Sequence, residues 1–468
     1  MMKRLTLIRN ARAVVTCDPS DRVIFDTDIL IRDGRIGQIG KNIDLPEKEA
    51  EIIDGSGKFI YPGLVNTHHH FFQTFVRNLI AIDFPGLSLL EWLDKIYRIF
   101  REIDAEVIYY SSLVAMADLL KHGCTTAFDH QYCYTGKTGK EAVDRQMEAA
   151  RLLGIRYHAG RGCNTLPRTE GSTMPDEMVE TTGEFIEDCE RLIGRYHDPE
   201  PFAMTRIVVA PCQPVNCYTD TFVESAALAR RRHVRLHTHL AEGENDAMIK
   251  RWGKRSLAWI RDVGFAGPDL WIAHGWDILP EEYRDMGEMG IGISHCPATA
   301  MLCGAPILDM RAMRDAGITI SLGCDGSATN DSSNLLDSLR LAYLMQCSQS
   351  RKRGGTVSPY EILKIATVNG AKTLGQEELG SLEEGKGADL FMIDAEVLEL
   401  SGALHDPKNL LAHVGCTGPV WLTMVNGKVV YREGALAGID ERSLAEKAES
   451  VCDRVLRSSF PGIFSGNP

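Results

Sequence analysis

Two short runs each place two histidines one residue apart, a spacing that suits metal binding. PGLVNTHHHFFQ, at 62–73, contains His68 and His70, and RLHTHLAEGE, at 235–244, contains His237 and His239. Alternate side chains share one face of a strand, so each pair could bind one metal ion, whereas His69 would face away and be structural. Two hydrogen-bonded histidines at a strand end would give the same pattern. For His237 we favour that structural role.

Further candidate groups follow other β-rich runs. LWIAHGWD contains His274, ISLGCDGSATND contains Asp325, and Glu242 comes three residues after His239. Nitrogen ligands with one carboxylate suit zinc or ferrous iron and leave a position for water, whereas calcium and magnesium prefer oxygen ligands. We therefore predict one divalent metal per chain, zinc or else iron, with ligands among His68, His70, His239, His274 and Asp325.

The segment from about residue 62 onward has the pattern of a (β/α)8 TIM barrel, in which short β-rich runs alternate with helical ones. The predicted strands cover 63–67, 125–129, 156–159, 207–210, 235–239, 270–273, 292–294 and 318–322, and predicted helices include 105–122, 140–153, 221–231 and 310–316. Barrel sites lie at the carboxyl ends of the strands, where the candidate ligands fall. A doubly wound α/β sheet is the alternative, but no GxGxxG loop follows an early strand.

Both ends of the chain are β-rich. Asp33-Gly34 and Asn426-Gly427 lie between apolar runs and predict tight hairpins. We expect the two ends to form one small β-sandwich beside the barrel. The predicted division is sandwich at 1–61, metal-dependent hydrolase barrel at 62–373, sandwich again at 374–440, and a C-terminal helix and tail at 441–468.

Composition limits the partners. A net charge of −13 disfavours nucleic acid and anionic membranes, which require a basic face. The N-terminal run MMKRLTLIRNARAVV lacks the apolar core of a signal peptide, and no apolar run is long enough to span a bilayer. Thirteen scattered cysteines without a CxxC pair predict reduced thiols and a cytoplasmic location.

Around these residues the sequence resembles the amidohydrolase superfamily, in its branch of aromatic deaminases and triazine aminohydrolases. The superfamily likeness lies in PGLVNTHHH, HTHLAE and AHG, and the likeness to the branch in GCTTAFDHQY, YHAGRGC, LPRTEGS and TNDSSNL. The resemblance extends over nearly the whole chain. It implies a TIM barrel with a split β-sandwich, and hydrolysis of carbon–nitrogen bonds in cyclic amidines.

The resemblance also implies roles for single residues. Four residues match the metal ligands of the family: His68, His70, His239 and Asp325. Glu242 matches its proton shuttle, and His274 matches the histidine beside the attacking water. Asp325 would take the proton of that water and later pass it to the leaving amine. Some triazine chlorohydrolases lack the acidic group after the fifth strand, and its presence here favours substrates whose ring nitrogen must be protonated. His130 is expected to be structural.

Five residues are predicted to bind substrate, each with a structural alternative. Gln73 could present an amide to a heterocycle or be a loop amide. Trp92 could border the pocket or pack a helix. Arg161 could reach the substrate or form a salt bridge, and Asn330 could contact the substrate or cap a helix. Cys212 stands where several purine deaminases carry histidine, which indicates a neutral wall and puts a substrate contact there in doubt.

The predicted reaction removes an amino or alkylamino group from a small N-heterocycle, by water that the metal converts to hydroxide. A hydroxy-s-triazine such as hydroxyatrazine is the expected substrate. The alternatives are 8-oxoguanine, another oxopurine or a pterin; a dechlorinating hydrolase; and a non-catalytic relative without metal. The expected partners are the heterocycle and water, with a homo-oligomer, by default a dimer, as the assembly.

Overall fold

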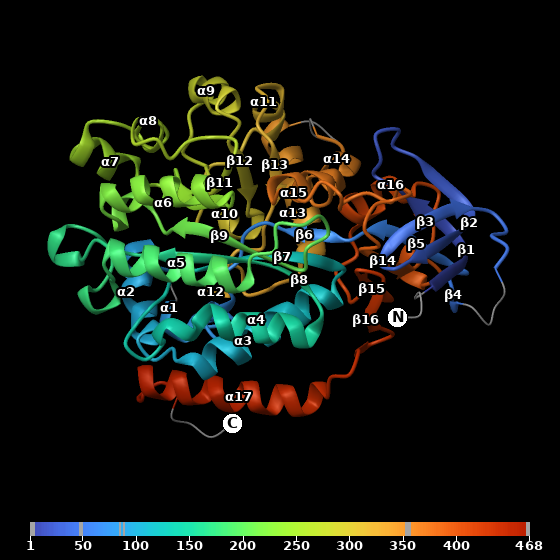
Figure 1. Cartoon of the computed structure of the whole chain (residues 1–468), viewed down its shortest axis with the longest axis horizontal. Helices are drawn as coiled ribbons and strands as arrows, with labels where there is room; N and C mark the ends of the chain where they lie inside the picture. The colour runs from blue at the N-terminus through green and yellow to red at the C-terminus, as the bar shows by residue number, and fades with distance from the viewer. Residues whose placement is uncertain (1–4, 46–49, 84–85, 88, 352–356, 465–468) are drawn as a thin grey trace.

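The computed structural model describes residues 5–45, 50–83, 86–87, 89–351 and 357–464. Its larger unit is a barrel of eight parallel strands that pair in chain order (Figure 1). Each overlaps one strand predicted from the sequence. They are β6 (Leu64–Asn66), β7 (Cys124–Gln131), β8 (Arg156–Cys163), β9 (Thr205–Pro211), β10 (Arg235–Leu240), β11 (Leu270–His274), β12 (Gly292–His295) and β13 (Ile320–Leu322).

The barrel is closed between its first and last strands. Thr67 donates its backbone N–H to the carbonyl of Leu322 at 3.0 Å, and Asp325 donates its own to the carbonyl of His68 at 3.0 Å. β6 ends at Asn66, so His68 and His70 lie just past its end, as they do for the strand predicted at 63–67. The bonds from Thr67 and Asp325 hold that segment beside the end of β13, at the rim of the barrel.

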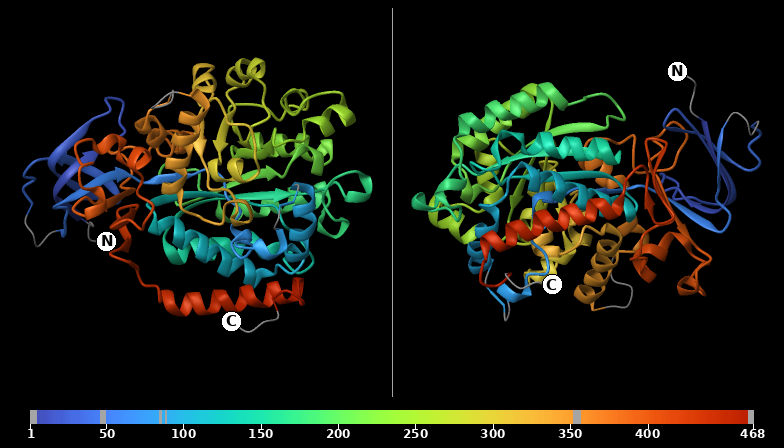
Figure 2. Two further views of the ribbon diagram at one scale, coloured as in Figure 1. Left: turned by 180° about the vertical axis from the view of Figure 1, so that it is seen from behind. Right: turned by 90° about the horizontal axis from the view of Figure 1, so that it is seen from below.

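Helices fill the connections between the strands and cover the outside of the barrel (Figure 2). The four helices predicted from periodicity are confirmed, with ends within two residues of prediction. The helices are α1 (Ile80–Asp83), α2 (Leu89–Phe100), α3 (Ala105–Lys121), α4 (Ala142–Leu153), α5 (Thr182–Tyr196), α6 (Thr219–Arg232), α7 (Asn245–Trp252), α8 (Ser256–Asp262), α9 (Tyr283–Glu288), α10 (Pro297–Leu302), α11 (Met310–Asp315), α12 (Ser327–Asn330), α13 (Leu335–Ser350), α14 (Pro359–Ile365), α15 (Val368–Thr373), α16 (Pro407–Leu410) and α17 (Glu441–Ser459).

The smaller unit is a nine-stranded sheet built from both ends of the chain. β5 pairs antiparallel with β14 and thereby joins the two ends. Both predicted hairpins are present, and Asn426 and Gly427 take φ values of 48° and 69°, as a tight two-residue turn requires. The strands are β1 (Leu5–Val15), β2 (Val23–Arg32), β3 (Arg35–Gly40), β4 (Glu51–Asp54), β5 (Lys58–Pro62), β14 (Leu390–Asp394), β15 (Leu422–Val425), β16 (Lys428–Arg432) and β17 (Ala435–Leu436).

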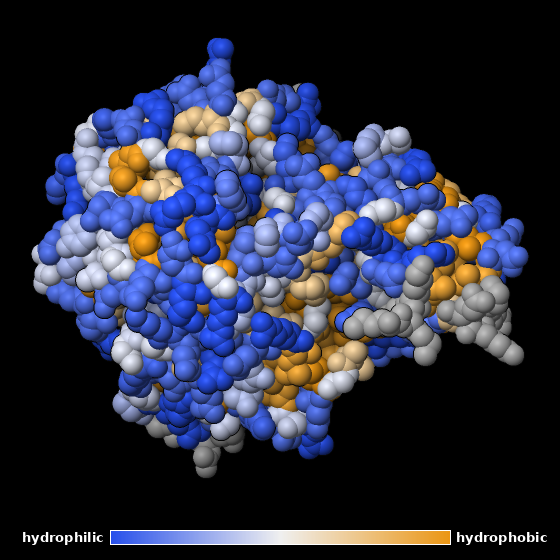
Figure 3. All heavy atoms as spheres, in the orientation of Figure 1, coloured by the Kyte–Doolittle hydropathy of each residue, from blue (hydrophilic) through white to orange (hydrophobic). Residues whose placement is uncertain are grey.

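The predicted fold, a TIM barrel with a small β-sandwich domain from both termini, is thus confirmed, and the strands of that domain pair as one nine-stranded sheet. The chain passes from the sheet to the barrel between β5 and β6, returns to the sheet after α15 and ends in α17, so we propose domain limits near residues 61, 373 and 440. Figure 3 shows hydrophilic side chains over most of the visible barrel face, with hydrophobic ones gathered where the sheet meets the barrel. All thirteen cysteines are free.

The C-terminal helix α17 leaves the sheet and runs back along the outside of the barrel (Figures 1 and 2). Val451 and Val455 are buried in a cluster with apolar residues of α2 and α3. At its first residue, Glu441 pairs with Lys121 at 2.5 Å. The helix therefore supports the segment that follows the first barrel strand. In the described part of the chain, no helix is long and apolar enough to cross a membrane.

Candidate metal centre and active site

The four predicted ligands converge at the carboxyl end of the barrel. His68 and His70 follow β6, His239 lies in β10, and Asp325 lies three residues past β13. The Nε2 atoms of His70 and His239 are 3.1 Å apart. Asp325 Oδ1 lies 3.4 Å from His68 Nε2 and 3.3 Å from His70 Nε2. Residues distant in sequence thus present nitrogen and oxygen atoms to one small space.

The second ring nitrogen of each histidine decides what that space can hold. His70 Nδ1 donates to the carbonyl of His130 at 2.8 Å, and His239 Nδ1 donates to that of Cys212 at 2.9 Å. Because a carbonyl oxygen can only accept a hydrogen bond, the proton of each imidazole is on Nδ1. The two Nε2 atoms therefore carry lone pairs that face each other. His68 Nε2 is buried and has no hydrogen-bond partner among the described residues. This donor set fits a divalent cation, which all these lone pairs could share.

The protonation states suit this interpretation. Burial lowers the pKa of His68 to about 3 and also lowers the pKa values of His70 and His239, so these imidazoles are neutral near pH 7. Burial alone would raise the pKa of Asp325. The close approach of the histidine nitrogens, that of His68 foremost, outweighs burial and holds that pKa well below the usual value. The site therefore offers neutral nitrogens and an ionised carboxylate.

Two further predicted groups flank the candidate ligands. His274 Nε2 lies 3.4 Å from Glu242 Oε1 and 4.0 Å from Asp325 Oδ2. Burial lowers the pKa of His274 to about 4. Burial, together with the charges of Asp325 and Glu244, raises the pKa of Glu242 well above its usual value. A neutral imidazole, a carboxyl group whose raised pKa favours its protonated form, and an ionised carboxylate therefore lie side by side.

The backbone at two of these residues is unusual. His274 has a φ of 70° and Asp325 a φ of 64°, both in the left-handed region. Few residues other than glycine adopt this conformation, and such residues cluster at functional sites. In both cases the chain leaves the barrel strand with the polar side chain held at the rim.

The loop that carries Glu242 is fixed by groups that the sequence reasoning missed. The carboxylate of Glu244 accepts the backbone N–H groups of Ala241 at 2.7 Å and Glu242 at 2.6 Å. Gln213 Nε2 donates to Glu242 Oε2 at 3.3 Å. An acidic residue two positions past the predicted shuttle, after a glycine, was the available signal for Glu244. Nothing in the pattern pointed to Gln213.

A cavity of about 540 Å³ opens over this cluster, and Gln73, Trp92 and Cys212 line it as predicted for substrate-binding residues. Gln73 Nε2 donates to the Tyr132 hydroxyl at 3.1 Å, while its buried Oε1 has no partner among the described residues. The hydroxyl of Thr329, another lining residue that the sequence reasoning missed, donates to Asp325 Oδ2 at 3.1 Å. That Gln73, Trp92 and Cys212 contact the substrate stays a prediction.

The structure places Arg161 and Asn330 apart from the described lining of this cavity. Arg161 is buried and pairs with Asp188 and Glu180 at 2.7 Å each, the salt-bridge alternative. A Cβ at Gly162 would lie 2.7 Å from the His130 ring, so the glycine faces the barrel interior and Arg161 faces the helices. That alternation was readable from the sequence.

Asn330 is the last residue of α12, and its amide Nδ2 donates to the carbonyl of Cys324 at 2.7 Å. This hydrogen bond stabilises the turn after β13 at Cys324, the residue before Asp325. His69 faces away from the cluster, as expected, with Nε2 2.9 Å from the hydroxyl of Ser333. The geometry therefore favours structural roles for both residues.

Comparisons with known proteins agree with this geometry. A model of the amidohydrolase family matches residues 59–430. The chain is 51% identical to hydroxydechloroatrazine ethylaminohydrolase of Pseudomonas sp. (strain ADP), over 96% of each chain. It is 35% identical to 8-oxoguanine deaminase of Pseudomonas aeruginosa, over 96% of this chain and 99% of that one.

A similar solved structure is that of a mutant atrazine chlorohydrolase from Arthrobacter aurescens TC1, complexed with zinc and atraton. The TM-score is 0.91 at 31% identity, covering 96% of this chain and 100% of that one. The likeness inferred from the histidine motifs thus holds across sequence and structure. This chain belongs to the amidohydrolase family.

Proposed function

We propose that this protein is a zinc-dependent aminohydrolase that removes an alkylamino group from a hydroxy-s-triazine such as hydroxyatrazine. The observation that carries the proposal is the convergence of three imidazoles and one carboxylate beside Glu242, whose pKa is raised, at the floor of a cavity. The sequence likeness to hydroxydechloroatrazine ethylaminohydrolase supports the choice of leaving group.

His68, His70, His239 and Asp325 would hold the cation. Nitrogen ligands with one carboxylate favour zinc or ferrous iron over magnesium or calcium, and the zinc bound to a similar chlorohydrolase supports zinc. When bound, such a cation lowers the pKa of a water ligand from 15.7 to about 7 and so supplies hydroxide at neutral pH.

The residues of the chain would move the protons. Glu242, whose pKa is raised by burial and neighbouring charge, can donate a proton to the ring nitrogen as oxygen adds to the adjacent carbon. Asp325, kept ionised, can accept a proton from the water and pass it to the departing amine. His274, being neutral, can hydrogen-bond the attacking oxygen. Overall, one carbon–oxygen bond replaces one carbon–nitrogen bond. One proton of the water leaves with the amine, and the other restores the acid form of Glu242, whose own proton stays on the ring nitrogen of the product.

The cavity suits a flat ring with an apolar substituent. Its lining includes the aromatic side chains of Trp92, Tyr97 and Tyr132, together with Leu93 and Val215. A ring can stack against aromatic walls, and an alkyl group can be buried against aliphatic ones. These walls support an alkylamino substrate.

A heterocycle panel on zinc-loaded enzyme tests this proposal. We expect hydroxyatrazine to release an alkylamine, which chromatography detects. The kcat/KM for hydroxyatrazine should be at least tenfold above the values for 8-oxoguanine, isoxanthopterin and atrazine. Ammonia from 8-oxoguanine as the preferred reaction would replace the proposed substrate with an oxopurine. Chloride from atrazine would indicate a dechlorinating hydrolase, and no turnover of any compound would overturn the proposal.

A further inference from the structure

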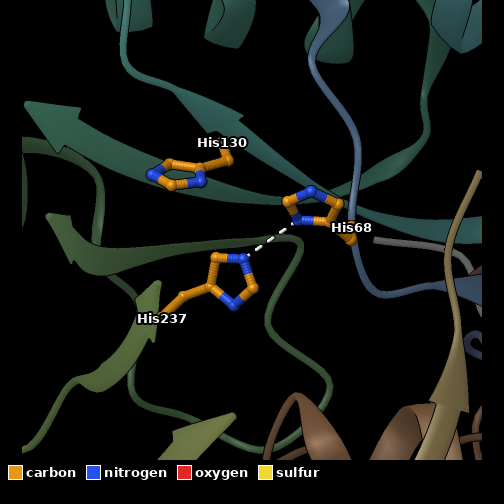
Figure 4. Close-up of side chains that lie close together, drawn as sticks. All are labelled: His68, His130 and His237. Atoms are coloured by element: carbon orange, nitrogen blue, oxygen red, sulfur yellow. Dashed lines mark hydrogen bonds between the residues drawn. The ribbon is translucent and has the colours of Figure 1, made fainter. Parts of the chain in front are cut away.

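A second layer of imidazoles lies behind the candidate metal ligands. His237 lies two residues before His239 on the same face of β10, and His130 lies on β7. Figure 4 shows the rings of His68, His130 and His237 turned toward one another. His68, His130 and His237 are completely buried. Imidazoles this deeply buried must be hydrogen-bonded or metal-bound to be stable.

A chain of hydrogen bonds runs from the backbone through His237 to His68. His237 Nδ1 lies 3.0 Å from the carbonyl of Trp271, which can only accept, so the proton of His237 is on Nδ1. His237 Nε2 is then an acceptor, and His68 Nδ1, 2.9 Å away, must donate to it. His68 is left with its lone pair on Nε2, the atom 3.4 Å from Asp325 Oδ1.

His68 differs in this respect from the other two candidate histidine ligands. His70 and His239 donate Nδ1–H directly to the backbone carbonyls of His130 and Cys212. For His68 the acceptor is a side chain, which substitution can remove. A partner that fixes the tautomer of a metal-binding histidine contributes about 10–100-fold to metal affinity.

We propose that His237 is a positioning residue that fixes His68 in the tautomer with its lone pair on Nε2, ready to bind a cation. The proposal rests on the metal site put forward under the proposed function. It assigns His237 a role in metal affinity in place of the purely structural role expected from the sequence.

A competing interpretation is a second metal site, because the nearest ring nitrogens of His68, His130 and His237 lie within 4.8 Å of one another. His130 Nε2 lies 2.7 Å from the carbonyl of Ala210, so its Nδ1 also presents a lone pair to the cluster. A cation there would require His68 to bind metal through both nitrogens as an anion. The hydrogen-bond chain needs only neutral imidazoles.

Zinc retention in two variants at position 237 tests the proposal. In His237→Leu the acceptor is lost, and we expect zinc affinity, measured by competition with a chelator, to fall about 10–100-fold. In His237→Gln the amide oxygen can accept from His68 while the amide N–H donates to Trp271, so zinc affinity should return to within about threefold. The matched control is His158→Leu, because buried His158 contacts Gln376 at 2.7 Å elsewhere in the barrel.

The outcomes separate this proposal from the proposed function. Wild-type enzyme without bound zinc would contradict the proposed function. Two zinc ions per wild-type chain, or His237→Leu and wild type with equal zinc affinity, would overturn the role of His237. An equal loss of zinc affinity in folded His237→Gln and His237→Leu would also overturn it. So would a loss of zinc affinity in the His158→Leu control as large as that in His237→Leu.

A measurement on the unmodified chain does not depend on the variants folding. In a histidine-selective ¹⁵N spectrum of the zinc-loaded wild type, we expect His68 to carry its proton on Nδ1. Protonation at Nε2 of His68 would overturn the proposal.

Discussion

Replacing Glu242 by glutamine removes a transferable proton and leaves the cavity wall nearly unchanged in shape. Glu242 Oε1 lies 3.4 Å from His274 Nε2 and Oε2 lies 3.3 Å from Gln213 Nε2, and the side chain retains 21% exposure at the cavity. A glutamine keeps an acceptor for Gln213 and fills the same volume. The variant should therefore fold, bind the cation and bind substrate as the wild type does.

The expected loss is catalytic. Proton transfer from a positioned acid contributes typically 10²–10⁴-fold, so kcat of Glu242→Gln should fall by that factor, about 3–5 kcal/mol in activation free energy. In the wild type, kcat/KM should fall on the alkaline side as Glu242 loses its proton. Because its pKa is raised, this limb lies well above the usual pKa of a glutamate, and the variant should lack it.

Steady-state kinetics over a pH series, with metal content measured on the same samples, provides the assay. The control is Glu281→Gln, the same chemical change at an exposed residue in the turn after β11, which should leave kcat unchanged. A Glu242→Gln variant with kcat within threefold of the wild type, or with an unaltered alkaline limb, would refute the assignment of Glu242 as proton donor.

Three further predictions concern other groups. Asp325→Asn should lower both zinc occupancy and kcat, because it removes the anionic ligand; unchanged metal content by elemental analysis would exclude Asp325 from the site. Glu244→Gln removes a negative charge that raises the pKa of Glu242, so the alkaline limb of kcat/KM should move to lower pH; a limb that stays or moves upward would contradict this. Arg161→Met removes the arginine partner of the partly buried Glu180 and one of the two arginine partners of the buried Asp188, which still pairs with Arg191, and should cost about 3 kcal/mol in the free energy of unfolding by denaturant, with KM unchanged in the folded variant. A raised KM with wild-type stability would return Arg161 to the substrate site.

The fold was predictable because its signals are local and repeated. Strands and helices alternate in type over most of the chain, and Asn426-Gly427 marks a hairpin by its own backbone preferences. The position of the segment after β6 was not predictable in this way. It depends on hydrogen bonds from Thr67 and Asp325 to residues far away in sequence, a tertiary effect.

The site was predictable only in part, for a related reason. The candidate ligands carry their chemistry in residue type and position at strand ends, and the structure brings His68, His70, His239 and Asp325 together. The supporting residues are ordinary in type. His237 gains meaning only from its 2.9 Å contact with His68, and this contact joins the first and fifth barrel strands. Single-sequence reasoning does not supply such pairings.

The arrangement of one cation among these side chains is the claim on which the rest depends. A crystal structure of the zinc-loaded protein, with anomalous data collected at the zinc edge, tests it most directly. We expect a single strong anomalous peak within about 2.0–2.2 Å of the Nε2 atoms of His68, His70 and His239 and of an Asp325 oxygen. A peak elsewhere in the barrel, or zinc bound without these four residues, would contradict it.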